Sequence, residues 1–201
     1  MIVPGRDVSS VNGSTSFVDG KFYHFYDFGL TNNPPKLYRD LLAGAKISIR
    51  IWDPHYRNVD IDLFSYIHQD GIRIEILTIC QDGEDKTDMD AFANEVLDAI
   101  DDEDVQDCKV WVYALMPRFL RNGYWTEWHD RFLIIDDTDV YLVGASLDAH
   151  MGTNKSYGIY HLTETDDKNL VIDTYKIYRD GIKDTSGGAL GNGYKCYVHR
   201  P

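Results

Sequence analysis

Hydrophobic and polar residues alternate along several short stretches of the chain, which is the pattern typical of β-strands with one buried face. This alternation predicts strands over residues 46–52, 73–79, 109–115, 131–135 and 140–143, and a short closing strand near the C-terminal end. Apolar residues recur at helical spacing over residues 37–44, 60–69, 89–100 and 171–182. Helices that alternate with strands imply crossover connections. The sequence therefore predicts an α/β fold with a mixed, mainly parallel sheet flanked by helices, in which residues 131–143 form a hairpin.

The size and composition of the chain are those of one globular domain. Its 201 residues are 43% hydrophobic and 13% aromatic, which is enough to bury one sizeable core. We expect a single domain over residues 1–201, in which residues 1–33 are a candidate N-terminal extension. No stretch resembles a secretory signal or a membrane span, which predicts a soluble, cytoplasmic protein. Cys80, Cys108 and Cys196 form no CxxC pair, so we expect free, buried thiols and no structural zinc.

Acidic residues outnumber basic ones, 33 to 20, and give this acidic protein a formal net charge of −13. This balance argues against a surface that binds nucleic acid broadly through counterion release, although it leaves room for a local basic cleft. Much of the acid lies over residues 82–90 and 101–107, which are expected to be solvated loops beside a helix. The first block lacks the central glycine and the closing glutamate of a calcium loop. We predict no metal and no cofactor.

The stretch from residue 127 to residue 149 reads EWHDRFLIIDDTDVYLVGASLDA and contains the strongest chemical signal. Strand alternation places His129 and Arg131 on one face and Asp136 on the other, where we expect Asp136 to make a structural bond near the turn. A histidine beside a cation is costly in a dry core but suits an anion site. Guanidinium donates to phosphate oxygens, and imidazole acts as nucleophile or acid–base catalyst. Ser146, after a glycine turn, adds a hydroxyl to this candidate site.

Further candidate residues lie at a strand end and just before the motif. Asp53 and His55 directly follow the predicted strand 46–52, and reactive groups in such sheets gather at strand ends. Tyr124 and Trp125 follow a glycine and are the aromatic residues best placed to contact a ligand or stack on a base. These four residues are candidate substrate-binding positions.

The letters HDRFLIID, from His129 to Asp136, followed by GASLD from residue 144, resemble the HxK(x)4D motif and trailing Gly-Ser of the phospholipase D superfamily. The upstream segments AKISIRIWDPHYRNVDIDLF and GIRIEILT also resemble the strand–helix–strand opening of a phospholipase D-like half. The resemblance covers roughly residues 37–162. It implies a phospholipase D-like fold for this part of the chain.

What this resemblance implies for activity is a metal-independent phosphodiesterase that attacks with a histidine and forms a phosphohistidine intermediate. In the family, two copies of the motif meet at one site, where one histidine attacks phosphorus and the other protonates the leaving oxygen. This chain has one copy, which implies a homodimer, and single-motif members are typically nucleases that act on nucleic acid. By residue-by-residue carry-over, His129 is nucleophile or acid, Arg131 holds the phosphate and Ser146 donates a hydroxyl.

The chain also departs from the family pattern. Arg131 replaces the family's lysine, which keeps the charge but not the shape of the side chain. The Gly-Ser turn has become Gly-Ala-Ser, and Asp148 stands at the usual asparagine position, where its charge would repel a phosphodiester. The following segment KSYGIYHL offers no carboxylate to orient the histidine, so Asp148 and Glu164 are the nearest substitutes.

These departures support a second hypothesis, a catalytically degenerate module. The chain is also similar to the phospholipase D-like C-terminal domain of MIT-domain proteins, which carries an HDR-type sequence and binds membrane lipid. In this interpretation Arg131 and Lys155 hold an anionic lipid, a phosphate or a carboxylate of a protein partner, although the acidic surface opposes broad contact with an anionic bilayer. A regulatory domain of a larger prokaryotic defence or toxin system is compatible with either chemistry.

Overall fold

The computed structural model describes residues 14–17, 20–26, 36–56, 58–100, 105–116, 130–144, 156–184 and 191–201. Nine strands of these residues form one sheet in the order β1-β2-β8-β7-β6-β3-β4-β5-β9. The strands are β1 (Ser14–Phe17), β2 (Gly20–Tyr26), β3 (Ser48–Trp52), β4 (Arg73–Ile79), β5 (Cys108–Leu115), β6 (Arg131–Ile135), β7 (Asp139–Val143), β8 (Ser156–Leu162) and β9 (Gly193–Arg200). The helices are α1 (Lys36–Gly44), the 3-10 helix η1 (Asn58–Tyr66), α2 (Lys86–Asp98) and α4 (Thr165–Gly181).

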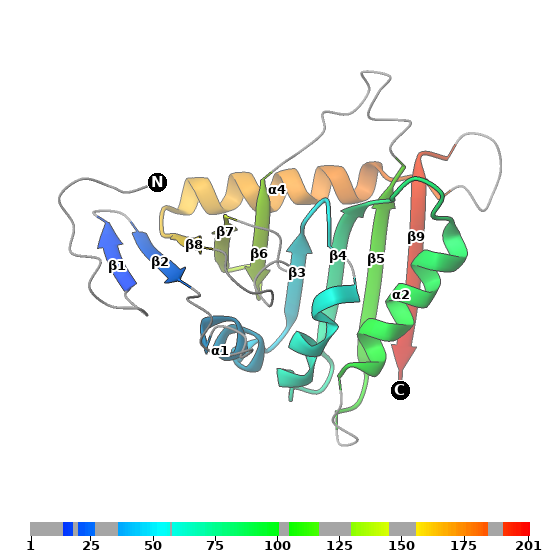
Figure 1. Cartoon of the computed structure of the whole chain (residues 1–201), viewed down its shortest axis with the longest axis horizontal. Coiled ribbons are helices and arrows are strands. Elements are labelled where there is room, and N and C mark those ends of the chain that lie inside the picture. Colours follow the sequence, from blue (N-terminus) through cyan, green and yellow to red (C-terminus); the bar gives the residue numbers. More distant parts are fainter. Residues whose placement is uncertain are drawn as a thin grey trace.

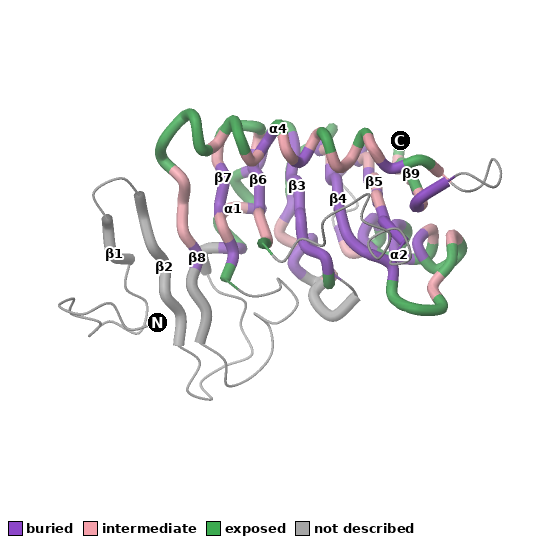
Figure 2. The backbone as a smooth tube through the Cα atoms, turned by 90° about the horizontal axis from the view of Figure 1, so that it is seen from above, coloured by how far each residue is buried: buried purple, intermediate pink, exposed green. Residues whose placement is uncertain are grey.

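Helices pack on both faces of the sheet (Figure 1). Helix α4 crosses one face, whereas α1, η1 and α2 lie on the other. A large apolar cluster that includes Ile49 and Phe92 joins the sheet to α1, η1 and α2. A smaller cluster that includes Trp52 and Tyr175 joins the sheet to α4. The central strands β3 and β4 are therefore buried on both faces (Figure 2), which explains the high apolar content of their sequences.

The predicted α/β fold, with a mixed sheet flanked by helices, is confirmed. Its parallel part is smaller than predicted, because among the described strands only β3 with β4 and β4 with β5 pair in parallel. The remaining neighbours are antiparallel. Alternating helices and strands specify crossovers only up to β5, after which β6, β7 and β8 follow one another as antiparallel neighbours. Strands β1 and β2 lie within the candidate extension and add to the sheet through β8.

Most predicted elements lie where the pattern placed them. Strands β4 and β6 begin and end at the predicted residues, and the helix predicted between β3 and β4 is the 3-10 helix η1. Helix α2 begins at Lys86 rather than at residue 89, because the carboxylate of Asp85 accepts hydrogen bonds from two backbone N–H groups of the first turn. Helix α4 begins at Thr165 rather than at residue 171.

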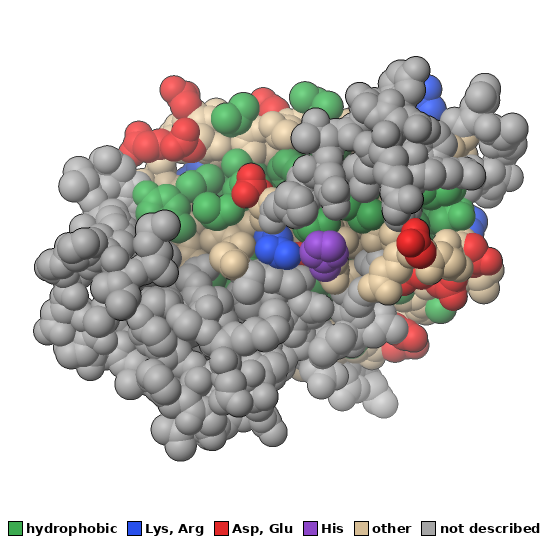
Figure 3. All heavy atoms as spheres, turned by 45° about the horizontal axis from the view of Figure 1, so that its top comes forward, with side chains coloured by type: hydrophobic (Ala, Val, Ile, Leu, Met, Phe, Trp, Pro, Cys, Tyr) green, Lys and Arg blue, Asp and Glu red, His purple; other side chains and the backbone are tan. Residues whose placement is uncertain are grey.

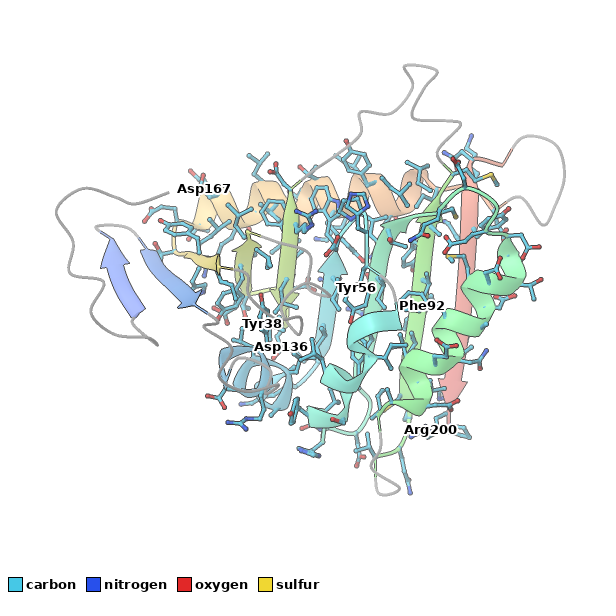
Figure 4. The ribbon with its side chains drawn as sticks, viewed as in Figure 1. Tyr38, Tyr56, Phe92, Asp136, Asp167 and Arg200 are labelled. Carbon is cyan, nitrogen blue, oxygen red and sulfur yellow. The ribbon has the colours of Figure 1, made fainter. Side chains whose placement is uncertain are left out.

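The turn between β6 and β7 is fixed by Asp136, which Figure 4 labels. Its carboxylate accepts hydrogen bonds from the backbone N–H groups of Lys46, Ile47 and Ser48, at 2.8 to 3.1 Å. Asp136 and Asp137 both have a positive φ, 53° and 58°, which Asp tolerates better than most residues. The turn is thereby joined to the start of β3, in agreement with the structural role expected for Asp136.

Replacing Asp136 by alanine is expected to lower the free energy of unfolding by about 1 to 3 kcal/mol, because three backbone N–H groups lose a charged acceptor. Asp136→Asn should lose less, since asparagine keeps a side-chain oxygen and tolerates a positive φ. Urea denaturation of both variants measures the difference, with Asp82→Ala as a control for removal of an exposed acid. Equal stability of Asp136→Ala and wild type would contradict the importance of these bonds.

Candidate active site

Two charged side chains meet where β3 ends and β6 begins. These strands pair in antiparallel fashion with Trp52 opposite Phe132, so the next two positions, Asp53 and Arg131, face each other. Nε of Arg131 donates a hydrogen bond to Oδ1 of Asp53 at 3.3 Å. The strand-end candidate and the motif arginine, which are 78 residues apart in the sequence, therefore belong to one site.

The carboxylate of Asp53 is held in a short turn and is fully buried, with 0% of the residue exposed. Its Oδ1 also accepts a hydrogen bond from the backbone N–H of His55 at 2.9 Å, a local bond that aspartate commonly makes in turns. The N–H of Ile79 donates to the carbonyl of Pro54 and ties the turn to the end of β4. A buried carboxylate requires such partners, and the N–H of His55 and the guanidinium of Arg131 supply them.

Arg131 is held by one edge of its guanidinium. The side chain is 21% exposed, and its hydrogen bond within the described part of the chain uses Nε. No described residue accepts from its Nη1 or Nη2 groups. Two such nitrogens in one plane form the donor pair that binds two oxygens of a phosphate or carboxylate. The geometry is compatible with the anion-binding role predicted for Arg131.

The residues of β6 point alternately to the two faces of the sheet, as predicted. Leu133 and Ile135 lie in the cluster beneath α1 and α2, whereas Ile134 lies in the cluster beneath α4. Arg131 shares the face of Leu133 by this alternation. Six predicted site residues fall outside the described residues: His129, Ser146, Asp148, Tyr124, Trp125 and Lys155.

Two of the proposed supporting carboxylates lie away from Arg131. Asp136 follows the opposite end of β6, about 17 Å along an extended strand, and backbone N–H groups occupy its carboxylate. Leu162 pairs with Val140 near that same end of the hairpin, so Glu164, which precedes α4, is also distant from Arg131. Neither carboxylate contacts the pair formed by Asp53 and Arg131.

His55 is the described histidine closest to this pair in the chain, and its residue is exposed. A histidine and a Lys or Arg side chain lie side by side on the surface drawn in Figure 3. Among the described residues, no group of three or more His, Cys, Asp or Glu side chains is arranged to hold a metal ion. The three cysteines are free and buried, as predicted. No described helix is both long and apolar enough to cross a membrane.

No protein-family model matches the sequence, and no curated protein sequence is significantly similar. Solved structures match the fold. Nuc from Salmonella typhimurium, a phospholipase D family member, aligns over 87% of this chain and 97% of its own, with a TM-score of 0.52 and 10% identity. NucT from Helicobacter pylori aligns over 81% and 97%, with a TM-score of 0.51 and 16% identity. A polyphosphate kinase from Porphyromonas gingivalis aligns over 84% and 27%, with a TM-score of 0.50 and 12% identity.

The chain therefore has a phospholipase D-like fold, which confirms at the level of the fold the resemblance found in the sequence. Likeness at such low identity concerns the fold alone, and one fold hosts many activities. The activity of the chain consequently has to be inferred from the side chains of the site. The structure describes two of them in contact, Asp53 and Arg131.

Proposed function

We propose that the chain is a phospholipase D-like phosphodiesterase that acts on nucleic acid or another phosphodiester. The observation that carries this proposal is Arg131, which buried Asp53 orients at the end of the sheet while two guanidinium nitrogens have no described partner. Donors fixed in this way stabilise the negative charge of a phosphate as bonds to phosphorus form and break. The fold shared with Nuc and NucT supports the same class of chemistry.

In the proposed mechanism, a ring nitrogen of His129 attacks phosphorus and the bond to the leaving oxygen breaks, which gives a phosphohistidine. The His129 of a second protomer protonates the leaving oxygen and then accepts a proton from water. That water attacks phosphorus, the P–N bond breaks, and His129 is regenerated. Arg131 and Ser146 contact the non-bridging oxygens. A homodimer is part of this proposal, because the chain carries one copy of the motif.

The test is hydrolysis of bis(p-nitrophenyl) phosphate and of single- and double-stranded DNA and RNA with EDTA present. Turnover that persists in the chelator is expected, together with a covalent protein–nucleotide adduct that is stable in alkali and lost in acid, as a P–N bond requires. Turnover that disappears in EDTA and returns with added metal would contradict the mechanism. Size-exclusion chromatography with light scattering tests the dimer separately.

Arg131→Lys is expected to retain part of the hydrolysis, because a cation remains beside the phosphate although the paired donors of the guanidinium are lost. Arg131→Ala should lower kcat by about a hundredfold or more, which is the usual cost of removing a fixed donor to the reacting oxygens. Alanine also leaves Asp53 without its ion pair, so Arg131→Ala combined with Asp53→Asn is the matched control for folding. Equal kcat values for the lysine and alanine variants would contradict a phosphate contact.

One observation favours a second candidate function, a catalytically degenerate anion-binding module. Asp53 already pairs with Arg131 and offsets part of its charge. In this function Arg131 and Lys155 bind an anionic lipid headgroup, a phosphate or a carboxylate of a protein partner. Saturable binding of inorganic phosphate or phosphatidylserine vesicles, lost in Arg131→Ala, by a folded dimer that shows no turnover would support it.

A further inference from the structure

Part of the sheet face that contacts α4 is left uncovered by that helix. In Figure 1, α4 crosses the upper ends of the strands, whereas β5 and β9 continue well below it. Along β5, Lys109, Trp111 and Tyr113 are half-buried and alternate with buried residues of the core on the opposite face. Tyr113 packs in the cluster beneath α4, which shows that the three half-buried side chains share the face of that helix.

This uncovered area carries aromatic and basic side chains, which we call the platform: Arg73, Lys109, Trp111, Lys195, Tyr197 and His199. The strand register arranges them in rows across β4, β5 and β9. The first row contains Arg73, Lys109 and His199, the second contains Trp111 and Tyr197, and the third contains Lys195. Cations therefore flank the aromatic pair on both sides along the strand direction.

The aromatic rings of the platform are accessible. Trp111 and Tyr197 are in contact, with ring centroids 4.7 Å apart and planes inclined by 36°, and Tyr197 is 50% exposed. His199 continues the series at 6.4 Å from Tyr197 with an interplanar angle of 19°. Nζ of Lys195 lies 5.9 Å from the centre of the Tyr113 ring. Exposed rings beside cations are the arrangement on which the bases of single strands stack, whatever their sequence.

The platform differs in charge from the rest of this acidic chain. It carries three permanent cations, next to the two acids Glu75 and Asp107, whereas the whole chain has a formal net charge of −13. The acids beside it are already paired. Asp107 contacts Lys109 at 2.7 Å and His199 at 2.8 Å, and Glu75 contacts Arg73 at 3.1 Å. An anionic ligand therefore meets less repulsion here than the net charge of the whole chain suggests.

We propose that the platform binds single-stranded nucleic acid, on the face of the sheet opposite to the one that Arg131 shares with Leu133. Bases stack on Trp111 and Tyr197, while phosphates contact Lys195 on one side and Lys109 on the other. A duplex keeps its bases stacked on one another, so it offers few ring faces to the platform. A second copy of the chain fits less well, because a two-fold axis through the platform brings like charges together. This binding requires no turnover and therefore goes beyond the proposed function.

Fluorescence anisotropy with a labelled oligothymidylate tests the proposal, using the full chain with His129→Ala so that no cleavage occurs. Adding Trp111→Ala is expected to raise Kd by about tenfold, since stacking contributes about 1.4 kcal/mol per base or more. Trp111→Phe should stay close to the parent, because phenylalanine retains a ring. Lys195→Gln should raise Kd and reduce its salt dependence, whereas Lys176→Gln, on α4, is the matched control without an effect.

The proposal would be overturned by no binding of the oligothymidylate at physiological salt or by equal Kd values for the parent and Trp111→Ala. It would also be overturned if heparin or duplex DNA bound as tightly as the oligothymidylate. Dimerisation that Trp111→Ala abolishes would instead identify a self-association surface and also overturn it. Trp111→Ala in the otherwise wild-type chain should hydrolyse bis(p-nitrophenyl) phosphate normally. Oligothymidylate binding without any diester hydrolysis by wild type would count against the proposed function and not against the platform.

Discussion

Replacing His129 by alanine is expected to lower phosphodiester hydrolysis by about a thousandfold or more, while the fold is retained. The effect is large because one residue type has two tasks in the proposed dimer. The histidine of one protomer attacks phosphorus, and the same residue of the partner protonates the leaving oxygen. Hydrolysis of bis(p-nitrophenyl) phosphate in EDTA measures the loss, and circular dichroism with thermal melting checks the fold. His68→Ala, which removes an exposed histidine, is the matched control.

Mixing the two proteins tests whether the site is shared. If each site uses two His129 side chains, an excess of His129→Ala under conditions of subunit exchange should inhibit wild type, because a mixed dimer retains one histidine. Unchanged activity in the mixture would show that each protomer acts alone. Normal turnover by pure His129→Ala would contradict the histidine mechanism altogether, whatever the oligomeric state.

The sequence predicted the elements of this fold better than their pairing. The segment RIEILTI carries enough β-branched and apolar residues to define β4 from its first to its last residue. The parallel pairing of β3 with β4 and of β4 with β5 also agrees with the crossovers that the alternation of helices and strands implied. By contrast, strand alternation contains no information about which strand lies next to β6. The hairpin of β6 and β7 was predicted and is confirmed. The antiparallel pairing of β6 with β3, of β7 with β8 and of β5 with β9 was missed, and with it the smaller parallel share.

In the candidate site, too, the sequence indicated the single residues but not the contact between them. Asp53 was predicted from its place at a strand end, and Arg131 from its place on a strand face. Their ion pair depends on the register that sets Trp52 opposite Phe132, a non-local fact that local patterns do not carry. The distance of Glu164 from Arg131 likewise follows from the pairing of β8 with β7. Composition gave no sign of the platform either, because the net charge of −13 is a sum over the whole chain and does not report a small basic area.

Replacing Glu75 by alanine is expected to lower the free energy of unfolding by about 3 to 5 kcal/mol, because it leaves a buried cation without its partner. Glu75 is 3% exposed and lies on β4 beneath α4. Its Oε2 accepts hydrogen bonds from Nε of Arg50 at 3.1 Å, from Nη1 of Arg179 at 3.3 Å and from the hydroxyl of Tyr175 at 3.3 Å. One carboxylate thus joins β3, β4 and α4.

Arg50 makes this substitution costly. It is only 3% exposed, and without Glu75 the one ion pair that it keeps among the described residues is with Asp137. Arg179 is 21% exposed and can turn towards water, so its loss of Glu75 is less serious. Burial raises the pKa of Tyr175 well above its usual value, and nearby Glu75 raises it further. The tyrosine therefore stays protonated and donates to the carboxylate. Glu75→Gln keeps an acceptor but not the charge, and should fall between alanine and wild type.

A double variant separates the loss of charge pairing from the loss of packing. Arg50→Met combined with Glu75→Leu replaces both buried charges by apolar side chains, and it should recover most of the stability that Glu75→Ala loses. Urea denaturation of wild type, Glu75→Ala and the double variant measures their free energies of unfolding. A loss below about 1 kcal/mol for Glu75→Ala, or no recovery in the double variant, would contradict the assignment of the loss to an uncompensated Arg50.

Trp52, whose ring contacts both Tyr175 and Phe132, directly precedes Asp53. Weaker docking of α4 should therefore also disturb the position of Asp53 and raise KM at temperatures where the variant remains folded.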